Sequence, residues 1–381
     1  MYLTEDMLAY IRESQEELKQ LIRDLCAIPA PSHHEEKRAA FCRDWFVNAG
    51  FEGVYIDGAL NVICPYGDAD AADLVVFMAH TDTVFPDLEP MPMREDEHKM
   101  YCPGVCDDTA NLAAMMICAR YFLRRGLRAD QGVLFVANAC EEGLGNLKGS
   151  GEIVRAFGNR IRELISFDGG TLNRIVDRAV GSHRYRVRVR TEGGHSYAAF
   201  GNRNAIRYLA SMIDTLYAVK VPQKDGCKTT YNVGAISGGT SVNTIAQQAE
   251  MLYEYRSDDR ECLEKMRRVF ESAVETYRAM GIDVEVEQVG DRPCAGNVDA
   301  KAHAQLIARA ETSIREVIGQ EPVRLSGSTD CNIPLSVGIP AICLSAVVGS
   351  RMHTREEELE LGSLIDGCRL TMDFMAGYFT A

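Results

Sequence analysis

The chain has 381 residues, which exceeds the size at which single hydrophobic cores stop growing and therefore predicts two domains. Its formal net charge of -14 argues against a nucleic-acid partner, because binding to a phosphate backbone requires clustered Lys and Arg. No stretch approaches the roughly 20 apolar residues of a membrane span, so we expect no membrane partner either.

The thirteen cysteines are scattered, without a CxxC pair or a repeating framework. The N-terminal segment predicts an amphipathic helix and lacks the basic stretch and uninterrupted apolar core of a secretory signal. Both features favour reduced thiols and a cytoplasmic location over a disulfide scaffold.

The first part of the chain, to about residue 180, alternates helical and strand patterns. We expect helices over residues 4–27, 34–49 and 109–126, and strands over residues 53–56, 61–65, 74–79, 133–139 and 164–168. This alternation predicts an α/β fold with a mostly parallel sheet that is flanked by helices.

The pattern changes near Ser182, where HRYRVRVRTEG alternates polar and apolar residues like a half-exposed antiparallel strand. We then expect helices over residues 204–217 and 260–280, and strands over residues 229–239, 249–257 and 283–288. Their order is that of a ferredoxin-like α+β unit. The first pattern resumes afterwards, which predicts a catalytic domain of residues 1–181 and 292–381 with an inserted domain at residues 182–291.

Three buried-strand patterns end at residues that bind metals. LVVFMAHTD ends at His80 and Asp82, VLFVANACEE at Glu141 and Glu142, and LISFDGG at Asp168, while Asp107 and Asp108 form a fourth cluster just before a helix. In open α/β sheets the ligand site lies beyond the carboxyl ends of the strands. The sequence therefore predicts a metal site at this edge of the sheet.

The spacing within the clusters indicates which residues could bind metal and which could orient a ligand or take a proton. His80 and Asp82 are two residues apart, so both side chains of an extended segment point to one face, where Asp82 can hold the second ring nitrogen of His80. Consecutive side chains diverge, so one carboxylate of the Glu141–Glu142 pair can bind metal while the other takes a proton from water. For Asp108 a plain helix N-cap remains the alternative.

The ordered motifs HTDT, GVCDDTAN, CEEGLGNLKGSG, SFDGG and MHTREEE resemble those of the co-catalytic zinc aminoacylase family over nearly the whole chain. That family includes glutamate carboxypeptidases, tripeptidase (peptidase T) and succinyl-diaminopimelate desuccinylases. The resemblance implies one metal bound by His80, Asp107 and Asp168, and a second bound by Asp107, Glu142 and His353. It also implies that Glu141 is the general base and that Asp82 orients His80.

The inserted domain carries further family motifs, and the resemblance makes it a lid or dimerisation domain. His195 of EGGHSY is expected to steady the oxyanion in the active site of the partner subunit of a homodimer. Asn243 and Arg256 are expected to bind a substrate carboxylate, although a surface ion pair is the alternative for Arg256. The segment SGSTDCNIP resembles a substrate loop, which places Gly327 and Ser328 near the ligand.

We therefore predict a metallopeptidase or amidohydrolase that cleaves amide bonds of small substrates with a free carboxylate. A di- or tripeptidase-like exopeptidase is the first interpretation, an N-acyl-amino-acid deacylase the alternative, and a non-catalytic binding protein on the same fold a remote one. The expected cofactor is a pair of divalent ions per chain, zinc in the first place, with cobalt or manganese as alternatives.

Overall fold

The computed structural model describes residues 2–68, 70–143 and 145–380, and the chain divides into two compact units. Unit 1 comprises the residues up to Ala179 and those from Gly296 onward, and unit 2 comprises Val180–Ala295. Unit 2 is therefore an insertion between two stretches of unit 1, whose boundaries the sequence predicts at 181/182 and 291/292.

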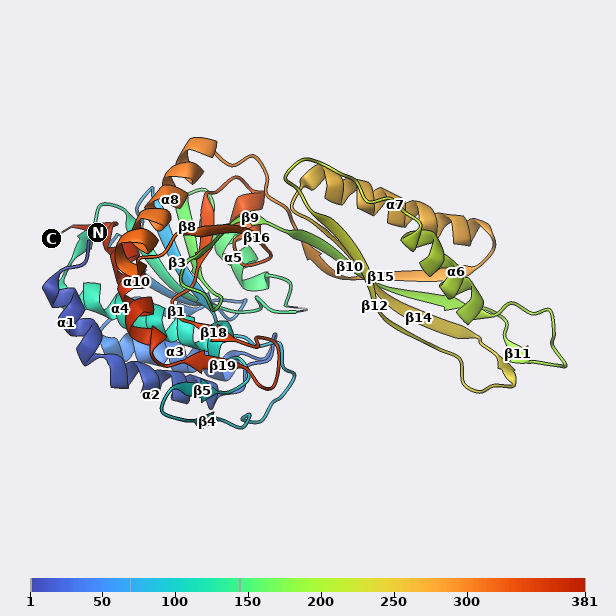
Figure 1. The fold of residues 1–381 in the computed structure, drawn as a ribbon, viewed down its shortest axis with the longest axis horizontal. Helices are drawn as coiled ribbons and strands as arrows, with labels where there is room; N and C mark the ends of the chain where they lie inside the picture. Colours follow the sequence, from blue (N-terminus) through green and yellow to red (C-terminus); the bar gives the residue numbers. More distant parts are fainter. Residues whose placement is uncertain (1, 69, 144, 381) are drawn as a thin grey trace. The chain divides into compact units, whose positions relative to one another are not determined.

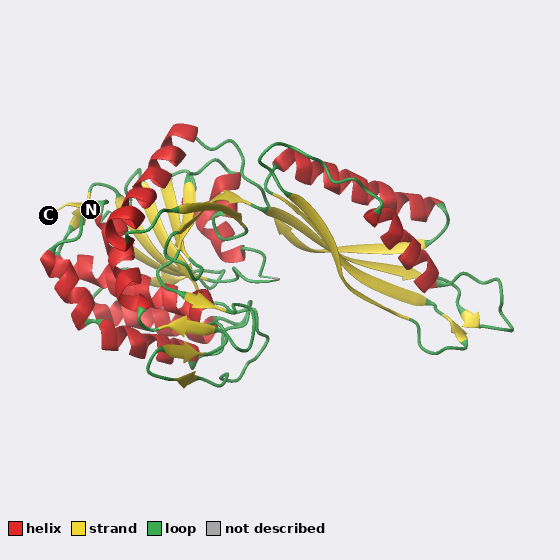
Figure 2. Ribbon diagram, in the orientation of Figure 1, coloured by secondary structure: helices red, strands yellow, loops and turns green. Residues whose placement is uncertain are grey.

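An eight-stranded sheet runs through unit 1 (Figures 1 and 2). Its strands follow the order β1 (Tyr55–Ile56), β2 (Val62–Tyr66), β7 (Gly132–Asn138), β3 (Leu74–His80), β8 (Ile161–Phe167), β17 (Ala341–Leu344), β9 (Arg174–Ala179) and β16 (Val323–Gly327). The central strand β3 pairs in parallel with both β7 and β8, whereas β1 and β2 are antiparallel at one edge. The predicted mostly parallel sheet is confirmed.

Helices surround this sheet (Figure 2). They are α1 (Glu5–Glu13), α2 (Gln15–Cys26), α3 (Glu36–Ala49), α4 (Asn111–Arg125), α5 (Lys148–Phe157), α8 (Ala300–Ser313), α9 (Asn332–Ser336) and α10 (Ser363–Ala376), with π-helical turns η1 (Val105–Ala110) and η2 (Ile314–Ile318). All residues of β3 are buried, and because alternate side chains point to opposite faces, both faces of the sheet are covered. Among the described residues no helix is both long and apolar enough to cross a membrane.

Aromatic side chains fill the middle of unit 1. The ring of Phe77 on β3 stacks against Phe135 on β7 and Phe167 on β8, with centroid distances of 5.9 and 6.3 Å. All three rings are buried, so they tie together the strands that lead to the predicted site. Two small sheets were not predicted, because their strands are only two or three residues long: β18 (Gly349–Ser350), β19 (Glu358–Glu360), β5 (Lys99–Tyr101) and β4 (Arg94–Glu95), and β20 (Phe379–Thr380) with β6 (Arg128–Ala129).

Unit 2 has the predicted ferredoxin-like arrangement. Its antiparallel sheet has the order β12 (Thr229–Gly238), β14 (Gln248–Ser257), β10 (Gly181–Arg190) and β15 (Asp283–Arg292), and its helices are α6 (Ala205–Tyr217) and α7 (Arg260–Ala279). The alternation along β10 places Tyr185, Val187 and Val189 in the core of the unit. The intervening arginines, Arg184, Arg186, Arg188 and Arg190, form ion pairs with glutamates of β14 and β15.

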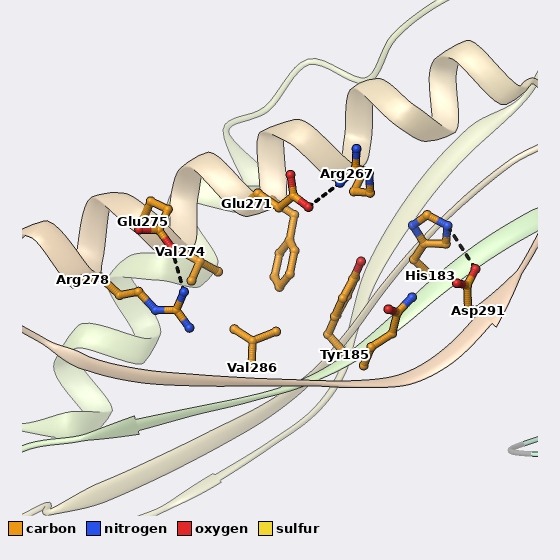
Figure 3. Close-up of a pocket in the computed structure, with 11 residues that line it drawn as sticks. His183, Tyr185, Arg267, Glu271, Val274, Glu275, Arg278, Val286 and Asp291 are labelled. Carbon is orange, nitrogen blue, oxygen red and sulfur yellow. Dashed lines mark hydrogen bonds and ion pairs between the residues drawn. The ribbon is translucent and has the colours of Figure 1, made fainter.

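A pocket of about 290 Å³ opens between α7 and the strands β10 and β15 (Figure 3). Its charged side chains bind one another across short distances, as in the pairs Arg267–Glu271 at 2.6 Å and Arg278–Glu275 at 2.7 Å. His183 lies 3.4 Å from Asp291 on the sheet side. The charged lining of this pocket therefore already has partners within unit 2.

Candidate metal centre

The carboxyl ends of β7, β3 and β8 lie side by side, because these strands are parallel neighbours in the sheet. His80 is the last residue of β3, Asp168 directly follows β8, and the Glu141–Glu142 pair follows β7 after a short turn. The structure thus brings the three strand-end clusters to one edge of the sheet.

The carboxylate of Asp107 lies between two imidazoles. Its Oδ1 is 3.0 Å from Nε2 of His80, and its Oδ2 is 3.1 Å from Nε2 of His353. The same nitrogen of His353 lies 3.3 Å from Oε2 of Glu142. Two oxygens of one carboxylate thus face two different imidazoles, so Asp107 could contribute one oxygen to each of two sets of metal ligands.

Asp168 belongs to a second group of potential ligands. The ligand atoms of His80, Asp108 and Asp168 lie within 4.8 Å of one another, as do those of His80, Asp107 and Glu142. The resemblance places Asp107 beside Asp168, whereas in the structure Asp108 is gathered with it. Oδ2 of Asp108 accepts a hydrogen bond of 2.8 Å from the backbone N–H of His80. Asp108 is not the N-cap of α4, because Ala110 holds that position.

Burial and the hydrogen bonds within the cluster shift the pKa values of its members. Hydrogen bonds to Asp107 and Glu142 raise the pKa of His353 to about 10. Burial raises the pKa of Glu142 to about 7. Burial also opposes the ionisation of Asp107, but hydrogen bonds from His353 and His80 outweigh it and lower the pKa of Asp107. Burial and the charge of Asp107 raise the pKa of Asp168 well above its usual range.

Two carboxylate oxygens of the cluster still need a partner. Within the described residues, Oε1 of Glu142 and Oδ1 of Asp108 are buried and accept no hydrogen bond. Such atoms are unfavourable in a protein interior unless a donor or a cation compensates them. Imidazole nitrogens and carboxylate oxygens are ligands that suit zinc, cobalt and manganese. The residues present therefore fit divalent metal ions.

Asp82 connects His80 to the Glu141–Glu142 turn. Nδ1 of His80 lies 3.1 Å from the backbone oxygen of Asp82 and 3.4 Å from its Oδ1, which leaves Nε2 facing Asp107. The carboxylate of Asp82 accepts hydrogen bonds from the backbone N–H groups of Glu141 and Glu142, at 2.9 and 3.0 Å. Ser32 donates a further hydrogen bond of 2.6 Å to Oδ2 of Asp82. One buried carboxylate thus orients both the histidine and the turn.

Two buried carboxyl groups near the site are not predicted from the sequence. Glu357 accepts hydrogen bonds from the backbone N–H groups of Gly104, Cys106 and Asp107, at 2.8 to 2.9 Å, and burial raises its pKa to about 7. Asp330 accepts a hydrogen bond of 2.6 Å from Asn138, and burial with the charge of Glu141 raises its pKa to about 8. The only signal of Glu357 in the sequence is an EEE run, in which spacing does not reveal the buried member.

His195 and Asn243 lie together in unit 2. His195 ends the short strand β11 (Gly194–His195), which pairs with β13 (Thr244–Ile245), and the backbone oxygen of Asn243 accepts a hydrogen bond of 2.9 Å from Ser196. Nδ1 of His195 accepts hydrogen bonds from the backbone N–H groups of Tyr197 and Ala198. In the neutral ring the proton therefore resides on Nε2. Both side chains are exposed.

Arg256 lies near the other end of unit 2, in the penultimate position of β14. Its guanidinium donates two hydrogen bonds of 3.0 Å to the carboxylate of Glu254, so the ion pair that was the alternative interpretation is present. About eight residues of extended strand separate it from Gln248 at the start of β14, which corresponds to roughly 26 Å. Arg256 is therefore near the end of β14, whereas the His195–Asn243 group lies beyond its start.

Gly327 and Ser328 lie where β16 ends in unit 1. A Cβ atom at Gly327 would come within 2.7 Å of Val176 on the neighbouring strand β9, so packing against Val176 accounts for glycine at this position. In the same loop Asp330 is fully buried and accepts a hydrogen bond from Asn138.

The chain is similar to known proteins over nearly its whole length. It is 24% identical to the uncharacterized protein YqjE of Bacillus subtilis, over 92% of this chain and 95% of that protein. A tripeptidase structure from Staphylococcus aureus has a TM-score of 0.76 and 22% identity, and covers 96% of this chain and 98% of that one. A structure from Bacillus subtilis described as a dinuclear metal binding peptidase, YXEP, has a TM-score of 0.65 and 17% identity, and covers 96% of this chain and 98% of its own.

The model of the peptidase family M20/M25/M40 matches residues 76–376, which include the predicted metal ligands and the whole of unit 2. This match confirms the resemblance inferred from the motifs and the prediction of a metal-dependent peptidase. It does not favour the deacylase alternative. The chain belongs to peptidase family M20/M25/M40.

Proposed function

We propose that this protein hydrolyses the peptide bonds of di- or tripeptides at a centre of two divalent metal ions. The observation that carries the proposal is the carboxylate of Asp107, whose two oxygens face His80 and His353 at 3.0 and 3.1 Å. The similarity in fold to the tripeptidase from Staphylococcus aureus supports a small peptide as the substrate.

The proposed ligands are His80, Asp107 and Asp168 for one ion and Asp107, Glu142 and His353 for the other, with Asp108 close to the first. When bound, the ions supply Lewis-acid chemistry that polarises the scissile carbonyl and acidifies water. Glu141 takes the proton from the attacking water and returns it to the leaving amine. Asp82 keeps His80 in the required tautomer and holds the backbone of Glu141 and Glu142.

The substrate site is proposed to draw on two chains. Arg256 lies near the end of β14 and the His195–Asn243 group lies beyond its start. The eight residues from Gln248 to Arg256 span roughly 26 Å, so we infer that the two groups of one chain do not both reach one small peptide. We infer a homodimer formed through unit 2, in which Arg256 binds the substrate carboxylate. His195 and Asn243 act on the site of the other subunit, where Nε2–H of His195 donates to the oxyanion. Gly327 and Ser328 line the same substrate site.

Zinc is the proposed metal, with cobalt and manganese as alternatives that the same donors accept. The thirteen cysteines, all within the described residues, form no disulfide, and twelve of them are buried, which supports the reducing cytoplasm as the proposed location.

The test is the specificity constant, kcat/KM, of the zinc-loaded protein on dipeptides, tripeptides and the matching N-acyl amino acids. We expect the highest kcat/KM on peptides with both termini free. Turnover of N-acyl amino acids alone would replace peptidase with deacylase. Metal binding without any turnover would leave a binding protein on the same fold.

A further inference from the structure

The turn that carries Glu141 and Glu142 is held by side chains at four consecutive backbone N–H groups. Asn61 accepts from Ala139 at 3.0 Å, and Glu35 accepts from Cys140 at 3.0 Å. Asp82 accepts from the next two residues at 2.9 and 3.0 Å. The three acceptors come from three different parts of the chain. The backbone of this turn is therefore determined by side chains rather than by a regular strand or helix.

The conformation of Cys140 explains why the turn needs such support. Cys140 has a φ of +58°, in the left-handed region that non-glycine residues adopt only when their surroundings impose it. It directly precedes Glu141, so its backbone angles set the direction in which the Glu141 side chain leaves the turn. Gly149 lets its backbone pack closely against the turn, since a Cβ atom there would meet the backbone oxygen of Ala139 at 2.1 Å.

Glu35 is the buried group at the strained position. Its side chain is fully buried, and Oε1 accepts from both the backbone N–H of Cys140 at 3.0 Å and its thiol at 3.2 Å. Glu35 precedes α3, but its side chain makes no capping hydrogen bond to that helix. Local helix capping therefore does not explain why this carboxylate is buried. Burial of a carboxylate is unfavourable, and here its hydrogen bonds to Cys140 offset part of that cost.

We propose that Glu35 is a positioning residue of the hydrolytic reaction: it holds Cys140 in the left-handed conformation and thereby aims Glu141 at its water. This inference rests on the proposed function, in which Glu141 is the general base. Glu35 acts on the direction of Glu141 and contacts neither metal nor substrate. Its loss is therefore expected to lower kcat while KM and metal content stay close to those of the parent enzyme.

The test compares Glu35→Ala with Glu35→Gln, which keeps an oxygen that accepts from Cys140. We expect kcat to fall about 10- to 100-fold in Glu35→Ala, as for a displaced reacting group, and to recover to within about threefold in Glu35→Gln. Glu163→Ala is the matched control, because Glu163 is also a buried, hydrogen-bonded carboxylate but lies near the opposite end of β8 from Asp168. It should lower the melting temperature without lowering kcat of the folded protein.

Hydrogen–deuterium exchange of peptides that cover residues 139–142 gives a readout independent of turnover. Exchange should become faster in Glu35→Ala and remain unchanged in Glu35→Gln and Glu163→Ala. Equal kcat in Glu35→Ala and the parent, or a loss of metal that accounts for the lower kcat, would overturn the proposal. Should the parent itself fail to hydrolyse any peptide, the proposed function fails, and the exchange data alone decide whether Glu35 holds the turn.

Discussion

The carboxylate of Glu254 accepts two hydrogen bonds of 3.0 Å from the guanidinium of Arg256, the side chain proposed to bind the substrate carboxylate. Glu254 also accepts one from Arg184 at 3.3 Å. Under the role proposed for Arg256, a substrate carboxylate competes with Glu254 for the same donors. The proposal therefore predicts that Glu254 affects substrate affinity.

We expect Glu254→Gln to lower KM for peptides with a free carboxyl terminus by about two- to fivefold, because a partly exposed ion pair of this kind contributes up to about 1 kcal/mol. The KM for the corresponding C-terminal amides should not change. Arg256→Ala is the opposite control and should raise KM for the free peptides. A higher KM in Glu254→Gln would instead mean that Glu254 orients Arg256.

Replacing Glu141 is expected to affect kcat, whereas replacing Glu142 is expected to affect metal content. Glu141→Gln should lower kcat by about 10² to 10⁴-fold, the range of general acid–base catalysis, with metal content unchanged. Glu142→Gln should lose metal, because this carboxylate lies 3.3 Å from His353 within the ligand cluster. Metal analysis and kcat of both variants check the assignment, and the reversed pattern would exchange the two roles.

The stability of the metal-free protein should fall as the pH rises. Hydrogen bonds to Asp107 and Glu142 raise the pKa of His353 to about 10, and burial raises the pKa of Glu142 and of Glu357 to about 7. Groups with a raised pKa in the folded state bind protons more tightly there, so their contribution is complete below the unfolded pKa and is lost as the pH passes the folded value. The stability contributed by the two carboxyl groups is therefore lost between about pH 4.5 and 7, and that contributed by His353 between about pH 6.5 and 10.

Melting temperatures of the metal-free protein between pH 6 and 9 measure this effect. We expect a decrease with pH that is smaller in His353→Ala and smaller in the zinc-loaded protein, where the cation replaces the protons. The pKa of Asp107 is lowered, so the stability that its carboxylate contributes is lost as the pH falls. This loss occurs only below the usual pKa of an aspartate, outside this pH range. A melting temperature that rises between pH 6 and 9 would contradict these pKa shifts.

The proposed sharing of sites between two chains predicts complementation. Neither His195→Ala nor Glu141→Ala should be active alone, but mixed dimers contain one site with both groups intact. We expect activity to return when the two variants are mixed and their subunits exchange. No return of activity despite exchange would place His195 within its own chain's site or outside the reaction, and a fully active monomer would exclude the dimer.

The strand-end residues could be predicted from the sequence because hydrophobic pattern and parallel topology together determine where the chain leaves the sheet. This reasoning located His80, Asp82 and Asp168 at one edge. His353 came only from the resemblance, since it lies in a polar segment without periodicity. The role of Glu35 depends on a contact with Cys140, 105 residues away, which local spacing does not reveal.

The inserted unit shows a second limit. The alternating pattern correctly predicted β14, whereas the expectation that Asn243 and Arg256 both bind a substrate carboxylate stays a prediction. Their separation follows from the length of β14, Gln248–Ser257, which carries Arg256 away from Asn243 at about 3.3 Å per residue. A motif identifies each of the two residues, whereas the distance between them depends on the geometry of the strand.

The most direct test of the central claim is a zinc titration of the metal-free protein, with bound metal and tripeptide hydrolysis measured in the same samples. We predict that full activity requires two ions per chain and that Asp107→Ala, which removes the carboxylate between His80 and His353, binds neither ion tightly and is inactive. Full metal content and full activity in Asp107→Ala, or saturation of the parent with two ions without any hydrolysis, would contradict the account.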